Sequence, residues 1–281
     1  MERIDFLSLV NNFKVVFLDS YGVLKNHEGL IEGVPQTIDY LRNQRIIIKI
    51  LTNDASRSRQ QQADLFKSLG LNGLTSNQII TSGTLARHFL EDKKIKGKIA
   101  YLGTENAAEY ILHIDRDSIP IGEIDLENCD DISAFVFLDD EGFDWNVDIN
   151  KVINLLRMKN IPVVVANSDK MYPVSPRDVA VGTGGIAKLV ENILNRKFIH
   201  FGKPDSQMFM YAYNQLLSEG DYTKNEILMV GDTLQTDILG GNKFGLHTVL
   251  VLSGNTRESA VDTLVSATGI IPDYICRSIV H

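Results

Sequence analysis

Four short segments of this 281-residue sequence carry side chains that could do chemistry together. Three of them follow apolar, strand-like runs and one is a Gly-Lys-Pro loop; their polar residues are Asp19, Thr52 with Asn53, Lys203, and Asp232 with Asp237. Three carboxylates would form a hard, oxygen-rich site suited to Mg²⁺. A hydroxyl and an amide suit phosphate oxygens, and a strand followed by a helix start adds backbone donors. The set therefore indicates a site for a phosphate group and a divalent cation.

Each segment also has a plain structural explanation when it stands alone. Asp19 could cap a turn at the end of a strand, and Thr52 with Asn53 could cap the next helix. A loop lysine such as Lys203 is usually solvated charge. Asp and Gly are common turn formers, so one Asp-rich turn proves little. Four such segments in this order indicate a functional site much more specifically than any one of them.

Strands and helices that alternate from end to end would position these side chains. The alternation is typical of an α/β protein with a largely parallel sheet. Apolar runs predict strands at 14–18, 46–51, 100–102, 134–138, 163–166, 227–230 and 248–252. Amphipathic stretches predict helices at 34–43, 58–69, 150–159, 186–195 and 206–217. Gly231 permits a tight turn before Asp232, and Thr236 could cap the helix that begins nearby.

Length and charge bound the class of protein. A chain of 281 residues suggests two domains. The net charge of −8 and a pI of about 5.3 argue against a nucleic-acid partner or an anionic membrane surface. Cys129 and Cys276 match no metal or redox spacing, so we expect buried, reduced thiols. The opening segment is charged and no run approaches the ~18 apolar residues of a spanning helix, which predicts a soluble, cytoplasmic protein.

In order and wording, the four segments resemble the motifs of the haloacid dehalogenase-like hydrolase superfamily, over essentially the whole chain. The resemblance implies that Asp19 is a nucleophile that forms an aspartyl-phosphate. It implies that Thr52 and Asn53 bind the phosphoryl group and that Lys203 neutralises its charge. Phosphoryl transfer needs little more than a positioned oxygen nucleophile and cations around the equatorial oxygens, which agrees with these roles. The neighbouring residues assigned to phosphate or substrate binding are Ser20 and Asp54.

The same resemblance implies a bound Mg²⁺ ion. Its ligands would be Asp19, the backbone carbonyl of Tyr21, and Asp232. Asp237 would support the metal or Lys203.

The spacing of the motifs predicts an inserted domain. The chain between Asp19 and Thr52 is too short for a lid domain, whereas the chain between Thr52 and Lys203 is far longer than a core sheet needs. We therefore predict a Rossmann-like catalytic core at 1–81 and 199–281, with an α/β cap of the C2 type inserted at 82–198. This placement resembles class IIA of the superfamily, the group of the nucleotide and pyridoxal phosphate phosphatases.

Three segments of the predicted insert, 137–143, 165–169 and 181–186, resemble the cap signature of that class. The last of them opens a helix, so its backbone amides could face an anionic substrate, although a glycine-rich helix start is more often plain packing. Asn167, Asp169 and Gly184 are the predicted substrate contacts of the cap.

Tyr21 stands where phosphatases of this superfamily usually carry a second aspartate. In an extended segment, positions 19 and 21 point to the same face. That aspartate would protonate the leaving alkoxide and later accept a proton from water. With an ordinary pKa near ~10, a tyrosine could donate a proton but is a poor general base. We therefore predict a preference for activated substrates such as aryl or acyl phosphates, or slow turnover of sugar phosphates.

The sequence thus predicts a Mg²⁺-dependent phosphatase that acts on a small phosphorylated metabolite, such as a sugar phosphate, with an impaired or altered acid/base step. One alternative is a phosphate-ligand binding protein with little turnover, which only the missing aspartate favours. The other is a hydrolytic dehalogenase, whose members share the tyrosine but carry their cap between the first two motifs and need no metal. The expected partners are a small phosphate ester and a second copy of the chain, paired through the cap.

Overall fold

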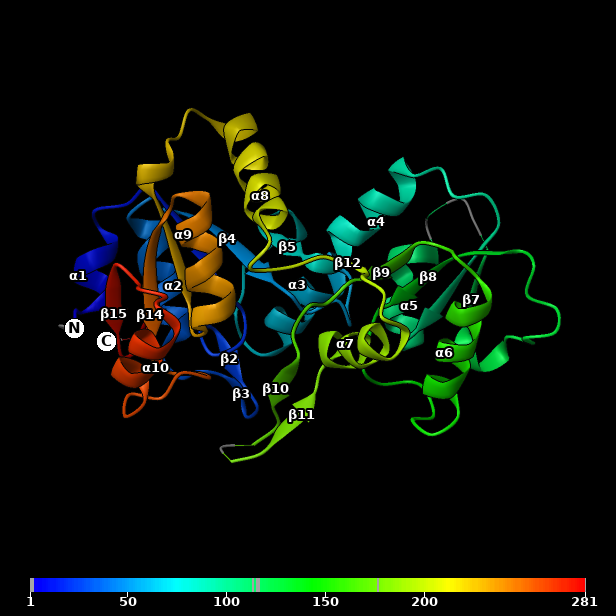
Figure 1. Cartoon of the computed structure of the whole chain (residues 1–281). Helices are drawn as coiled ribbons and strands as arrows, with labels where there is room; N and C mark the ends of the chain where they lie inside the picture. The colour runs from blue at the N-terminus through cyan, green and yellow to red at the C-terminus, as the bar shows by residue number, and fades with distance from the viewer. Residues whose placement is uncertain (1–2, 113, 115–116, 176, 281) are drawn as a thin grey trace. The chain divides into compact units, whose positions relative to one another are not determined.

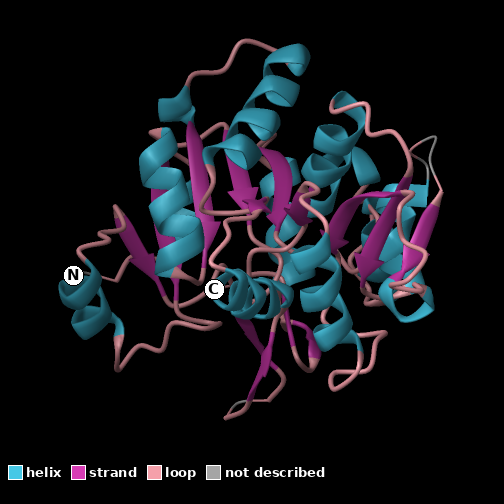
Figure 2. Cartoon of the chain, turned by 45° about the vertical axis from the view of Figure 1, so that its right-hand side comes forward, coloured by secondary structure: helices cyan, strands magenta, loops and turns pink. Residues whose placement is uncertain are grey.

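A computed structural model describes residues 3–112, 114, 117–175 and 177–280 (Figure 1). The chain divides into two compact units. The first unit comprises residues 1–52, 59–80 and 203–281, and the second comprises 53–58 and 81–202. Figure 2 shows the strands of each sheet accompanied by helices. No helix in the described ranges is both long enough and apolar enough to cross a membrane.

The first unit is built on a six-stranded sheet with the order β15-β14-β13-β1-β4-β5. Its strands are β1 (Val15–Leu18), β4 (Ile47–Thr52), β5 (Ile79–Thr81), β13 (Ile227–Gly231), β14 (His247–Val251) and β15 (Tyr274–Cys276). β1 pairs in parallel with β13 on one side and β4 on the other. Every residue of β1 and β13 is buried, as expected for central parallel strands covered on both faces.

Helices and short elements complete the first unit. The helices are α1 (Phe6–Val10), α2 (Val34–Asn43), α3 (Arg59–Ser68), α8 (Ser206–Glu219), α9 (Leu239–Phe244) and α10 (Val261–Thr268). The short elements are β2 (Lys25–Asn26), β3 (Gly29–Leu30), three-residue helical turns at Ser76–Gln78 and Lys224–Glu226, and the π-helical turn η4 (Leu234–Ile238). α2 follows Gly33, which has a φ of 86°, and buries Val34, Ile38 and Leu41 at helical spacing.

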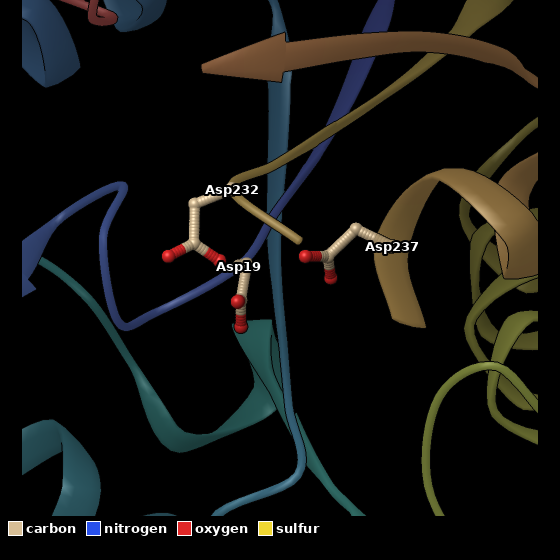
Figure 3. A group of neighbouring side chains, drawn as sticks. All are labelled: Asp19, Asp232 and Asp237. Atoms are coloured by element: carbon tan, nitrogen blue, oxygen red, sulfur yellow. The ribbon is translucent and has the colours of Figure 1, made fainter. Parts of the chain in front are cut away.

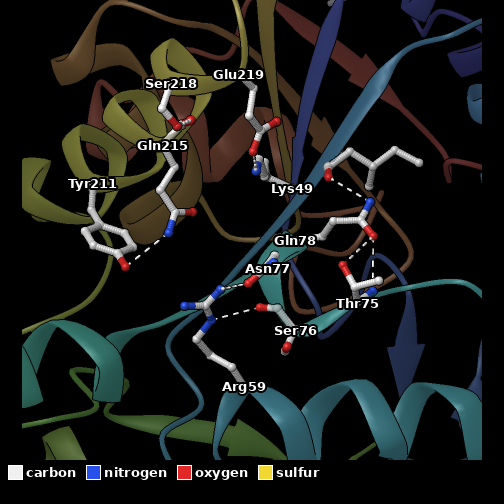
Figure 4. A network of polar contacts seen from close by, with 11 residues as sticks. Lys49, Arg59, Thr75, Ser76, Asn77, Gln78, Tyr211, Gln215, Ser218 and Glu219 are labelled. Atoms are coloured by element: carbon white, nitrogen blue, oxygen red, sulfur yellow. Dashed lines mark hydrogen bonds and ion pairs between the residues drawn. The ribbon is translucent and has the colours of Figure 1, made fainter.

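A buried lysine, Lys49, lies within β4 of the first unit (Figure 4). Its ammonium pairs with Glu219 at the end of α8. The turn after α3 is tied to the same strand, because the Gln78 side chain donates to the Ile48 carbonyl at 3.3 Å. These polar contacts fix the helices beside β4, whose last residue is Thr52.

The second unit contains a five-stranded sheet with the order β12-β9-β8-β6-β7, in which every pair is parallel. Its strands are β6 (Lys98–Leu102), β7 (Ser118–Pro120), β8 (Ile132–Phe137), β9 (Val163–Val165) and β12 (Ile199–His200). An antiparallel hairpin pairs β10 (Met171–Pro173) with β11 (Val179–Val181). The helices are α4 (Ser82–Asp92), α5 (Glu105–Leu112), α6 (Asp148–Met158) and α7 (Thr183–Leu194), with a short turn at Ile121–Glu123.

The core of the second unit forms between its sheet and its helices. Phe135 and Phe137 of β8 belong to one buried cluster with Leu155 of α6 and Val190 of α7. The predicted fold class, α/β with a largely parallel sheet and a second, smaller sheet, is confirmed. Both cysteines are free and buried, as predicted.

Candidate active site

Two neighbouring strands place Asp19 and Asp232 side by side. β1 and β13 run parallel in register, with Leu18 opposite Val230, so the residues that follow them leave the sheet at the same edge. The backbone amide of Asp19 donates to the carbonyl of Val230 at 2.9 Å. This edge, at the carboxyl ends of parallel strands, is where ligands bind in open α/β sheets.

Asp237 completes a cluster of three carboxylates (Figure 3). It comes from the π-helical turn η4, and one oxygen from each of Asp19, Asp232 and Asp237 lies within 4.8 Å of the others. The carboxylate of Asp237 accepts the backbone N–H of Thr233 at 3.1 Å. The prediction that Thr236 caps this helix is wrong, because Thr233 precedes the first helical residue and Thr236 lies inside the turn.

Lys203 lies between two of these carboxylates. Its Nζ is 2.6 Å from Oδ1 of Asp19 and 2.7 Å from Oδ1 of Asp237, and only 2% of its side chain is exposed. The solvated loop lysine considered as an alternative is therefore excluded. Burial alone lowers the pKa of Lys203, but the carboxylates of Asp19 and Asp237 outweigh it and raise the pKa above its ordinary value.

The two oxygens of the Asp19 carboxylate differ in their hydrogen bonding. Oδ1 accepts from Lys203 and also from the backbone N–H of Ser20 at 2.7 Å. Oδ2 makes no hydrogen bond with a protein group among the residues that the structure describes. The side chain of Asp19 is 13% exposed, so this oxygen belongs to the most accessible carboxylate of the three.

Asp232 is fixed from two sides. Its Oδ1 accepts from the Thr233 hydroxyl at 2.9 Å, and its Oδ2 accepts from the backbone N–H of Asn255 at 2.6 Å. Gly22 and Gly254 pack closely against the same carboxylate. A Cβ would lie 2.1 Å from Oδ2 of Asp232 at position 22 and 2.0 Å from it at position 254. Glycine is required at both places by this close approach.

The loop after β14 also contacts the loop that follows Asp19. The hydroxyl of Ser253 donates to the carbonyl of Gly22 at 2.6 Å. Sequence reasoning missed this segment, 253–255, although Ser-Gly-Asn directly follows a predicted apolar strand, as the recognised motifs do.

The electrostatics of the cluster fit a bound divalent cation. Burial and the charge of Asp237 raise the pKa of Asp232 to about 7. Burial likewise raises the pKa of Asp19 well above its ordinary value, against the lowering effect of Lys203. Lys203 pairs with Asp19 and Asp237 and supplies one positive charge to a cluster of three carboxylates, so a hard, oxygen-ligated cation such as Mg²⁺ would balance the remaining charge.

Tyr21 lies two residues after Asp19, but not in a regular strand. β1 ends at Leu18 and the chain bends at Ser20, so strand alternation does not place Tyr21 on the same side as Asp19. Burial and the charge of Asp232 raise the pKa of Tyr21, against a hydrogen bond with the His27 backbone. The phenol therefore stays protonated at neutral pH.

Asn53 and Asp169 meet in the second unit. Nδ2 of Asn53 donates to Oδ1 of Asp169 at 2.8 Å, and its carbonyl accepts from the Ser82 hydroxyl at 2.7 Å. Asn167 joins them, because its Oδ1 accepts the backbone N–H of Asp169 at 2.9 Å. Asn53 follows Thr52, the buried last residue of β4. Three of the predicted binding residues thus form one polar group.

Asp54 and Gly184 have local structural roles. Oδ1 of Asp54 accepts from the amide and the hydroxyl of Ser56 at 2.9 and 2.6 Å, which closes a turn. The amide of Gly184 donates to the carbonyl of Asp169 at 2.9 Å, and a Cβ here would lie 2.3 Å from the carbonyl oxygen of Ser168. Close packing explains the glycine, and a substrate contact at Gly184 stays a prediction.

Fold and carboxylate cluster define the class of this protein: an α/β protein with a largely parallel sheet and an acidic site at the carboxyl ends of its central strands. The family model for haloacid dehalogenase-like hydrolases matches residues 16–115, and a related HAD-hydrolase-like model matches 200–281.

Known proteins resemble the chain over its length. The crystal structure of a possible sugar phosphatase of the HAD superfamily from Cytophaga hutchinsonii is 50% identical, covers 100% of this chain and 99% of its own, and has a TM-score of 0.96. Phosphoglycolate phosphatase 2 of Arabidopsis thaliana is 28% identical over 98% of this chain and 94% of its own length. Glycerol-3-phosphate phosphatase of Gallus gallus is 27% identical over 97% of this chain and 91% of its own length. The chain therefore belongs to the haloacid dehalogenase-like hydrolase superfamily, in its class IIA.

Proposed function

We propose that this protein is a Mg²⁺-dependent phosphatase that hydrolyses a small phosphorylated metabolite, such as a sugar phosphate, through an aspartyl-phosphate on Asp19. The observation that carries the proposal is the buried ammonium of Lys203, 2.6 Å from Asp19 and 2.7 Å from Asp237. A fixed cation beside an oxygen nucleophile is what phosphoryl transfer needs. The phosphatases among the relatives also support a small phosphate ester as the substrate.

Asp19 performs the first step. Its Oδ2 attacks phosphorus, the bond from phosphorus to the leaving oxygen breaks, and the phosphoryl group is transferred to the carboxylate. Lys203 keeps Oδ1 in place and offsets negative charge on the transferred group. Asp19, Asp232 and the backbone carbonyl of Tyr21 would hold Mg²⁺, with Asp237 beside them; when bound, the ion supplies charge neutralisation for the phosphoryl oxygens.

Proton transfer is the altered part of the mechanism. The raised pKa of Tyr21 keeps its phenol protonated at neutral pH, so the proton is available for a leaving oxygen. In this protonated form the phenol cannot act as a base toward the water that hydrolyses the aspartyl-phosphate. A positioned acid/base is typically worth ~10² to 10⁴ in rate, and its loss affects poor leaving groups most.

We propose that the second unit is the cap that sets substrate choice. Asn167 and Asp169 are its candidate substrate contacts, and their hydrogen bonds keep Asn53 in one orientation. A homodimer through this unit is the proposed assembly. Light scattering on the purified protein would measure it, and a monomer would contradict it.

The test is hydrolysis of p-nitrophenyl phosphate with and without Mg²⁺. Activity should depend on the ion and should disappear in Asp19→Asn, whereas Asp221→Asn, at an exposed position of the first unit, should retain it. Binding of inorganic phosphate without turnover across a panel of phosphate esters would overturn the proposal and favour a binding protein. Release of halide from a haloacid would favour a dehalogenase.

A further inference from the structure

The second unit contains a pocket of about 350 Å³, and no residue of the carboxylate cluster lines it. Its polar lining consists of Ser168, Lys170, Lys188, Glu191, Lys197 and His200. Pockets that bind small molecules start at about 300 Å³. This pocket therefore has room for a small metabolite.

The pocket is positively charged in a chain whose net charge is −8. Lys170, Lys188 and Lys197 contribute three ammonium groups, and Glu191 contributes the single carboxylate. Even with His200 neutral, positive charge is in excess. A concave site lined by charge of one sign concentrates ions of the opposite sign, so the pocket attracts anions.

Glu191 anchors the wall of the pocket. Its side chain is 5% exposed, and Oε1 accepts the backbone N–H of Phe198 at 2.7 Å and lies 3.2 Å from Nε2 of His200. Oε2 pairs with the ammonium of Lys188 at 3.0 Å. Both oxygens are thus engaged, so this carboxylate orients a lysine and a histidine, and the charge of Lys188 offsets its own.

Lys188 keeps binding capacity for a ligand. An ammonium has three donors and 40% of the side chain is exposed, so the ion pair with Glu191 leaves donors available. Lys197 lines the same pocket. An anion bound there would be attracted by both ammonium groups. Glu191 raises the pKa of Lys188, which keeps it cationic.

Local sequence explains how the pocket is built. Gly184, Lys188 and Glu191 are spaced four and three residues apart, so they share one face of α7. The helix ends at Asn195 in a left-handed conformation, with a φ of 48°, which turns the chain back and carries Lys197 to the same side. The pocket therefore rests on a helix and a tight turn.

We propose that this pocket binds a small anion that carries a phosphate or carboxylate group, through residues other than those of the carboxylate cluster. The three lysines would bind its charge, and Ser168 and His200 would add hydrogen bonds. Ser168 precedes Asp169, which accepts the amide of Asn53, so a bound anion would act on the loop that orients this predicted phosphoryl-binding residue. The proposal goes beyond phosphatase activity and does not depend on it.

Calorimetric titration of the Mg²⁺-free full-length protein with inorganic phosphate, and separately with malonate, tests the proposal. Each lost charged contact weakens binding by about tenfold or more, so Lys188→Gln/Lys197→Gln should lose at least that factor. The control is Lys67→Gln/Lys96→Gln, at two exposed positions. Lys170→Gln is a milder second variant, should the double variant fail to fold. Equal affinity in the pocket variants and the wild-type protein, or no binding of either anion, would overturn the proposal.

Two further arms identify the anion. If it is a second acidic group of the substrate, the pocket variant should raise the KM for phosphoglycolate and leave that for p-nitrophenyl phosphate unchanged. If it is a separate metabolite, malonate should alter the turnover of both esters in the wild-type protein and not in the pocket variant. Phosphate binding that disappears in Asp19→Asn, and persists in Lys188→Gln/Lys197→Gln, would place the anion at the carboxylate cluster and refute the proposal.

Discussion

The hydroxyl of Ser253 donates to the carbonyl oxygen of Gly22 at 2.6 Å, although 231 positions of sequence separate them. This hydrogen bond joins the loop after β14 to the loop that carries Asp19. The next residue but one, Asn255, holds Asp232 through its backbone N–H. One short segment therefore orients both strand-end loops of the candidate metal site.

Ser253→Ala should weaken Mg²⁺ binding while the protein stays folded. Residues that orient metal ligands typically contribute 10- to 100-fold in affinity or activity, and we expect a loss at the lower end, about tenfold, because Asn255 still holds Asp232. Titration with Mg²⁺ followed by calorimetry measures it. Ser68→Ala, at the exposed end of α3, is the control. Unchanged affinity would show that the loop is held without this bond.

Lys203→Met should remove activity and reduce stability at neutral and alkaline pH. The variant leaves Asp19 and Asp237 buried without their cation, and breaking a buried pair typically costs about 3–5 kcal/mol. Because Lys203 lowers the pKa of Asp19, its removal raises that pKa further. The destabilisation should therefore be smaller at pH 5, where a larger fraction of Asp19 is protonated. Denaturant unfolding at both pH values gives the comparison; an equal loss at both would contradict this explanation.

Tyr21→Asp should raise the turnover of alkyl phosphates more than that of aryl phosphates. The aspartate would restore a group able both to donate and to accept the proton, worth ~10² to 10⁴ in rate when well placed. A series of leaving groups of graded pKa measures the effect as a flatter dependence of kcat/KM on leaving-group pKa. Tyr21→Phe is the matched control, since it removes the donor only. Similar rates for alkyl and aryl esters in the wild-type protein would refute the role given to Tyr21.

Ionisation of Asp139 should make the second unit less stable as pH rises from about 4 to 6. Burial raises its pKa from 3.8 to about 6, so the folded state binds the proton more tightly than the unfolded state. This contribution is complete below 3.8 and is lost as pH rises through 6; two pKa units correspond to about 3 kcal/mol. Asp139→Asn cannot ionise, so its stability should fall less across that range. Parallel slopes for the variant and the wild-type protein would contradict the assignment.

Elements with a strong local pattern could be predicted from sequence. α2 lies at the predicted positions because Gly33 and an apolar 3–4 spacing mark its start and its buried face. α4 was not predicted, since it opens with Ser82-Gly83-Thr84, a composition typical of loops. The Ser82 hydroxyl bonded to the carbonyl of Asn53 shows what stabilises that start, and this contact joins residues far apart in sequence.

The residues of the candidate site likewise divide into those that local sequence could predict and those that it could not. Asp19 and Asp232 could be recognised because each directly follows an apolar run, and parallel strand ends meet at one edge. The role of Ser253 could not, because its partner lies at the other end of the chain. Nor could the sequence show that the Gly184 amide donates to the carbonyl of Asp169, because only tertiary structure brings the two together.

Three glycines surround the carboxylates so tightly that the cluster tolerates almost no sequence drift. A Cβ at Gly22 or Gly254 would collide with Asp232, and a Cβ at Gly231 would lie 2.1 Å from the side chain of Asp237. In a library that samples every amino acid at every position, substitutions of these glycines should be depleted after selection for activity as strongly as substitutions of the aspartates. Any evolutionary route to a new reaction in this protein must then change residues elsewhere, because the residues of the candidate metal site cannot be substituted.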